Sequence, residues 1–173
     1  MLVWQKDSKE SACDFERVVW DAIRGKCAGG ILHSCQDETS KHSQLLDRHS
    51  GIDYLQELPA GLRGIAVRLQ WVDRAFPTYT IRSRRPNGVV TEMAKRLDNS
   101  QGFLYPHLTV QAYIEKPRGI GALLQAYVCK TTALYDCVRD GKMRMQTNPI
   151  DGVEFAVVDV ADIADCWAWK NVC

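Results

Sequence analysis

Apolar and polar positions alternate most regularly between residues 51 and 71, and this pattern predicts a β-hairpin. The first strand spans Gly51 to Leu55, the turn contains Pro59-Ala60-Gly61, and the second strand runs from Gly64 to Trp71. Successive side chains of a strand point to opposite faces, so the second strand has one face with Ile65, Val67 and Leu69 and another with Ala66, Arg68 and Gln70. We expect the hairpin to bring Asp53 close to Arg68 and Gln70, which is the geometry of a metal or phosphate site.

The rest of the chain predicts a sheet with flanking helices. Strands are expected at 29–33, at 76–82 antiparallel to the second hairpin strand, at 107–115 and at 155–160. Helices are expected at 11–25, 88–97 and 122–139, with a polar connection at 36–47 and a short terminal helix or turn at 163–169. This order favours a single domain, 1–173, of the α/β or α+β class with a central mixed sheet.

Three short motifs follow one another in the first half of the chain. They are Phe15-Glu16 on the first predicted helix, the segment from Asp47 to Asp53, and Arg68-x-Gln70 on the second hairpin strand. In this order they resemble the motifs of the PD-(D/E)XK nuclease superfamily, and within it Mrr-type restriction endonucleases and Holliday junction resolvases. The resemblance implies a restriction-endonuclease-like fold and a DNA nuclease that uses Mg²⁺ or Mn²⁺, in restriction or defence against foreign DNA.

The resemblance also assigns roles to individual residues. Asp53 is the implied principal metal ligand and Glu16 an accessory acid. Arg68 stands where the family has Glu or Gln, and Gln70 stands where it has Lys, so two positions depart from the pattern. Lys95 is the candidate for a displaced catalytic lysine. From spacing alone, Glu16 and Lys95 also fit ordinary solvated helix faces.

The two departures leave other functions open. A cation at Arg68 near Asp53 would pair with that carboxylate and compete with a metal ion for it. This favours a catalytically inactive nuclease-fold module that binds nucleic acid or a protein partner, as a homodimer or in a larger complex. A small structural protein with an unrelated α+β fold is a third possibility.

Charge is balanced over the whole chain but not locally. The formal net charge is +1 over 173 residues, so any attraction to nucleic acid must come from a local patch. Basic residues cluster between positions 82 and 96, and of these Arg82, Arg84 and Arg85 are the candidate DNA-binding residues, which alternatively form a solvated face.

Several classes of protein find no support in the sequence. The chain has no run of about 18 apolar residues and no apolar leader after Met1, so we expect a cytoplasmic protein with no membrane contact. P-loop, GxGxxG, GxSxG and HExxH motifs do not occur. The seven cysteines contain no CxxC pair and fit reduced thiols, with zinc as the less favoured alternative, on ligands drawn from Cys27, His33, Cys35, His42 and His49.

Overall fold

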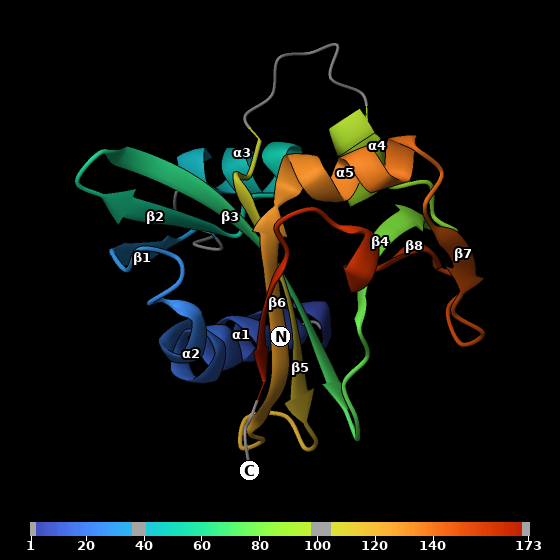
Figure 1. The fold of residues 1–173 in the computed structure, drawn as a ribbon. Helices are drawn as coiled ribbons and strands as arrows, with labels where there is room; N and C mark the ends of the chain where they lie inside the picture. The colour runs from blue at the N-terminus through green and yellow to red at the C-terminus, as the bar shows by residue number, and fades with distance from the viewer. Residues whose placement is uncertain (1–2, 36–40, 98–104, 171–173) are drawn as a thin grey trace.

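The structure is a computed structural model that describes residues 3–35, 41–97 and 105–170. Its largest element is a six-stranded mixed sheet with the strand order β1-β2-β3-β5-β6-β9 (Figure 1). The only parallel pair in this order is β3 with β5, and all other neighbours are antiparallel. The strands are β1 (Ile31–Ser34), β2 (Tyr54–Leu58), β3 (Gly61–Val72), β5 (Leu108–Glu115), β6 (Leu123–Lys130) and β9 (Trp167–Lys170).

A second, antiparallel sheet contains three strands in the order β4-β8-β7. They are β4 (Thr78–Arg84), β7 (Arg144–Thr147) and β8 (Glu154–Asp159). Figure 1 shows this small sheet to one side of the long strands β5 and β6. The protein is therefore an α+β protein with a mixed sheet, a small antiparallel sheet and a few helices.

The first helical segment covers one face of the mixed sheet. It runs without a break through α1 (Val3–Asp14), the π-helix η1 (Phe15–Trp20) and α2 (Asp21–Ile23). Helix α3 (Lys41–Ser50) precedes the hairpin, α4 (Glu92–Leu97) follows β4, α5 (Thr131–Arg139) follows β6, and the 3-10 turn η3 (Val160–Asp162) follows β8. None of the described helices has the length and apolar composition that crossing a membrane requires.

Strand alternation divides the interior into two cores. Phe15 and Val19 of η1 pack against the β3 face that carries Ile65, Val67 and Leu69, as the alternation predicted. On the opposite face, Tyr113 and Tyr127 pack against the small sheet and α5. Burying each large apolar side chain contributes roughly 1.5–3 kcal/mol, so both cores hold the mixed sheet in a fixed position.

A buried carboxylate fastens the first helical segment to the sheet. Asp14, which is fully buried, accepts hydrogen bonds from Trp71 Nε1 at 2.8 Å, Arg17 Nη2 at 3.0 Å and the Gly119 backbone N–H at 3.2 Å. Burial alone would raise the pKa of Asp14, but these three donors outweigh it and hold the pKa below its usual value.

The predicted hairpin is confirmed, with strands at 54–58 and 61–72 joined at Pro59-Ala60. Its first strand was predicted at 51–55 and begins three residues later, at Tyr54. The strands predicted at 107–115 and 155–160 are also confirmed as β5 and β8. The strand predicted at 29–33 is confirmed as β1. The helix predicted at 11–25 begins earlier, at Val3, and ends two residues earlier, at Ile23.

The strand predicted at 76–82 exists as β4, but its predicted pairing with β3 is wrong. β4 pairs with β8 in the small sheet, and the place beside β3 belongs to β5. The chain between β3 and β5 includes both β4 and α4, which gives the long crossover that a parallel pair requires. The neighbour of β3 is thus set by contacts between segments distant in sequence, which local alternation does not predict.

The helix predicted at 122–139 is half wrong, because its first part is strand β6 and only 131–139 is helical. Residues of β6 are buried on both faces, with Leu123 and Ala126 in the first core and Tyr127 and Cys129 in the second. A strand that is buried on both faces has a continuous apolar sequence, and periodicity alone does not distinguish such a sequence from a buried helix.

Three further boundaries differ from the predictions. The polar connection predicted at 36–47 contains the start of α3 at Lys41, the helix predicted at 88–97 begins only at Glu92, and the terminal helix or turn at 163–169 ends as β9. Trp167 and Trp169 of β9 pack against the first core.

Gly51 and Arg96 hold α3 and α4 together. The buried Arg96 guanidinium donates to the Ser50 and Gly51 carbonyls, the latter at 2.9 Å, and lies 4.9 Å from the centre of the Tyr105 ring. Gly51 has φ +55, and a Cβ atom there would lie 2.7 Å from Arg96 Nη2. A side chain at Gly51 would thus add backbone strain and displace the guanidinium.

We predict that Gly51→Ala lowers the free energy of unfolding by about 1–3 kcal/mol, because the left-handed backbone and the Arg96 contact both oppose a methyl group. Urea unfolding followed by tryptophan fluorescence measures this change. Gly25→Ala is the matched control, since no atom lies within 4 Å of its Cβ position. Equal stability of the two variants would contradict the constraint at Gly51.

Candidate functional site

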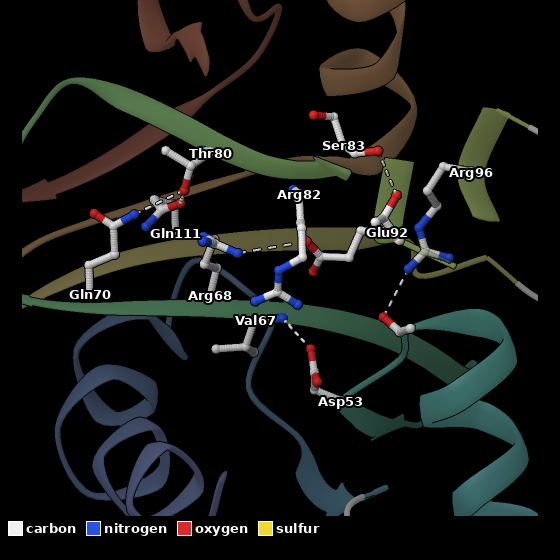
Figure 2. Close-up of polar contacts among 12 residues, drawn as sticks. Asp53, Val67, Arg68, Gln70, Thr80, Arg82, Ser83, Glu92, Arg96 and Gln111 are labelled. Atoms are coloured by element: carbon white, nitrogen blue, oxygen red, sulfur yellow. Dashed lines mark hydrogen bonds and ion pairs between the residues drawn. The ribbon is translucent and has the colours of Figure 1, made fainter. Parts of the chain in front are cut away.

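The polar face of β3 points toward the small sheet and carries Arg68 and Gln70 (Figure 2). Arg68 Nη1 lies 3.8 Å from Glu92 Oε2, and its guanidinium lies 4.7 Å from the centre of the Phe155 ring. Its Nε is buried without a hydrogen-bond acceptor among the described residues. An arginine held this way has donor capacity left for a ligand.

A hydrogen-bonded chain of three side chains joins the two sheets. Gln70 Nε2 on β3 donates to Thr80 Oγ1 on β4 at 2.9 Å, and Thr80 Oγ1 donates to Gln111 Oε1 on β5 at 3.2 Å (Figure 2). The Thr80 backbone N–H also donates to Gln111 Oε1 at 3.2 Å. Gln111 is fully buried, and its Nε2 has no acceptor among the described residues. The chain fixes the spacing between the sheets beside Arg68.

Glu92 is the first residue of α4, and the start of this helix is held against β4. Thr91 Oγ1 donates to the Ser83 carbonyl at 3.1 Å and accepts from the Ala94 N–H at 3.4 Å. Glu92 Oε2 in turn accepts from the Arg82 backbone N–H at 3.3 Å. These contacts point the Glu92 carboxylate toward Arg68. Arg96, one helical turn after Glu92, turns inward to the Ser50 and Gly51 carbonyls.

Cations outnumber acids around Glu92. We call Arg68, Arg82, Arg85 and Lys95 the basic cluster. Burial lowers the pKa values of Arg68 and Arg85, and repulsion from Arg82 lowers both further, whereas Glu92 raises them. Burial also lowers the pKa of Lys95, and Asp47 opposes that shift most strongly. Repelling cations in a partly dry site favour the binding of an added anion.

Asp53, just before β2, supplies a hydrogen-bond acceptor to a backbone N–H group of β3 that β2 leaves unpaired. Its Oδ2 accepts the Val67 backbone N–H at 2.6 Å, which β2 does not reach (Figure 2). Burial raises the pKa of Asp53 to about 7, the Val67 hydrogen bond lowers it, and the charges of Asp47 and Glu92 raise it further. The carboxylate therefore has a structural task, and near neutral pH it holds a proton part of the time.

The structure does not bring all of the candidate residues together. Glu16 is on η1, which packs on the β3 face opposite to Arg68 and Gln70. Its carboxylate interacts with the Tyr54 hydroxyl and helps to raise the pKa of Tyr54, which burial raises most. Arg84 is exposed and forms an ion pair with Glu154 at 2.8 Å, whereas Arg82 and Arg85 form no ion pair within the described part of the chain. Lys95 does lie near Glu92 and Arg85.

The described residues do not fit a Mg²⁺ or Mn²⁺ ion as arranged. Such ions prefer several oxygen ligands that converge, and no three His, Cys, Asp or Glu side chains within residues 3–35, 41–97 and 105–170 do so. Asp53 already accepts a backbone N–H, and the cation of Arg68 lies beside Glu92. The same finding gives no support to zinc at Cys27, His33, Cys35 and His42, while the His49 side chain lies outside the described residues.

Six of the seven cysteines lie in the described part of the chain, and all six are free thiols. Cys173 lies outside the described residues.

Sequence reasoning identified Arg68, Gln70 and Lys95, but missed the roles of Glu92, Thr80 and Gln111. The alternation of β5 already placed Gln111 on a polar face with Tyr113. Only the packing of one sheet on the other shows that this face is buried. The chain matches no protein-family model, and it has no significant match among curated proteins or solved structures.

We predict that Asp53→Asn makes the protein more stable at pH 8, on the order of 2 kcal/mol, and removes part of its pH dependence. The pKa of Asp53 is about 7 in the folded state and 3.8 in the unfolded state. Between these pH values the folded protein binds a proton at Asp53 that the unfolded chain has lost, so its stability falls as the pH rises through this window. Asparagine keeps an acceptor for the Val67 N–H but carries no charge. Urea unfolding of both proteins at about pH 5 and about pH 8 measures the effect, and equal pH slopes would contradict it.

Proposed function

We propose that this protein is a nucleic-acid-binding module of nuclease-like fold that holds backbone phosphates with its basic cluster. The observation that carries the proposal is an excess of cations over acids in one partly buried place, where the basic cluster and Arg96 outnumber Glu92, Asp47 and Asp53. Arginine and lysine supply most phosphate contacts in nucleic-acid complexes, and they act locally even when the net charge is near zero.

The order of elements supports the nuclease-like part of the proposal. A helix with Glu16, a hairpin strand that begins after Asp53 and a second strand with Arg68 and Gln70 follow one another as the resemblance implies. The chemistry of β3 favours binding over hydrolysis. Arg68 faces Glu92 and Phe155, so it contributes positive charge where the family has a metal ligand. A guanidinium in that position suits a phosphate oxygen better than a metal ion.

We predict that Arg82→Ala combined with Arg85→Ala weakens DNA binding for all sequences alike. Each phosphate contact releases about 0.9 counterions, so losing two contacts reduces the slope of log K against log salt by roughly 1.8 units. Fluorescence anisotropy on one labelled duplex at several salt concentrations measures the slope. The variant keeps the Glu92 contact of Arg68, so its fold is expected to remain intact.

Arg139→Ala is the matched control, because Arg139 pairs with Asp136 within α5 and lies outside the basic cluster. Arg84→Ala is a second control, because the Glu154 carboxylate already engages Arg84. Both controls should keep the wild-type slope within experimental error. If the slope of the double variant equals theirs, the basic cluster does not contact phosphates.

Metal-dependent DNA hydrolysis remains the competing proposal from the resemblance. Calorimetric titration with Mg²⁺ or Mn²⁺ separates the two functions. The binding module predicts no heat of binding at millimolar metal in wild type or in Asp53→Ala. Heat that disappears in Asp53→Ala, together with DNA cleavage that Asp53→Asn abolishes, would establish the nuclease and overturn the binding module.

A further inference from the structure

A cavity of about 640 Å³ lies between the polar face of β3 and the small sheet. Its size falls within the range of ligand pockets in proteins, roughly 300–1,000 Å³. The walls combine three aromatic side chains with polar groups, and the residues used below are Arg68, Gln70, Phe76, Tyr113, Gln146 and Phe155. Its walls come from both sheets and from the segment before β4.

The aromatic wall offers flat apolar surface. Phe76 is 39% exposed, and its ring centre lies 6.0 Å from that of Tyr113 in an edge-to-face arrangement. Phe155 lies below the Arg68 guanidinium at 4.7 Å. An exposed phenyl ring at a cavity wall is a platform on which a planar ring can stack.

The polar wall offers donors and acceptors. Arg68 lines the cavity with its side chain 20% exposed, so the guanidinium N–H groups that Glu92 does not engage can donate to a ligand acceptor. Gln70 gives its Nε2 to Thr80, which leaves the amide oxygen as an acceptor. Gln146 on β7 is exposed, and its amide has no partner within the described part of the chain.

We propose that this cavity receives the base of an unpaired nucleotide. A nucleobase is planar, and its edge carries both the acceptors that Arg68 lacks and donors that suit the Gln70 oxygen. A purely apolar ligand would leave the accessible guanidinium N–H groups of Arg68 without an acceptor, and an inorganic anion is far smaller than the cavity. This inference rests on the proposed function, and Arg68 connects the two, because it lines the cavity and also faces Glu92 in the basic cluster.

The test compares two short duplexes of equal charge by fluorescence anisotropy. One has a single bulged nucleotide in its centre, tried with each of the four bases, and the other has a bulged abasic nucleotide in the same place. Stacking of one base contributes about 1–3 kcal/mol, so at least one base should bind roughly fivefold or more tightly than the abasic bulge.

Two variants on different walls locate the effect. Phe76→Ala removes the stacking platform and Gln146→Ala removes an edge contact, and each should reduce the preference for the base while the abasic duplex binds as before. Leu62→Ala is the matched control, because Leu62 is 62% exposed near the hairpin turn and lies outside the cavity, and it should keep the full preference.

The outcomes separate this inference from the proposed function. Equal binding of base and abasic bulges by wild type would overturn the base pocket and leave phosphate binding in place. A preference that survives in both cavity variants would also overturn the pocket. Failure to bind either duplex at low salt would instead overturn the proposed function, and the inference with it.

Discussion

The burial of Arg68 between two sheets is the constraint on which the candidate site depends. A guanidinium loses much of its hydration there, and an uncompensated buried charge costs several kcal/mol. Glu92 at 3.8 Å and the Phe155 ring at 4.7 Å offset part of this cost. Glu92 belongs to α4 and Phe155 to β8, and both are distant in sequence from Arg68. Contacts with Arg68 therefore help to position both elements against β3.

The remaining polar groups of this interface show why the sheets cannot slide freely. Thr80 receives a hydrogen bond from Gln70 and donates one to Gln111, so β3, β4 and β5 share one hydroxyl. Moving the small sheet would leave buried amides unpaired, at about 1–3 kcal/mol each. The arrangement that stabilises the interface also leaves Arg68 Nε and Gln111 Nε2 with donor capacity. Stability and a candidate binding function thus use the same side chains.

The basic character of the site is local, so a chain of net charge +1 still carries a positive region. Arg82 and Arg85 extend the positive region from Arg68, and burial together with repulsion from Arg82 lowers the pKa of Arg85. Within the described residues these two side chains form no ion pairs, whereas Arg84 between them pairs with Glu154. Three arginines close together in sequence therefore have different electrostatic environments, because β4 is irregular between Arg82 and Arg84 and ends before Arg85.

The sequence alone determined the hairpin, the two faces of β3, the strands β5 and β8 and the proximity of Lys95 to the basic stretch, because each follows from local periodicity or short spacing. It did not determine that β5 lies beside β3, that 123–130 is a strand, or that Glu16 faces away from Arg68. Those features depend on contacts between distant residues, which compete with local propensity and often override it. The pairing of Arg68 with Glu92 and the cavity beside it exist only once the second sheet packs on the first.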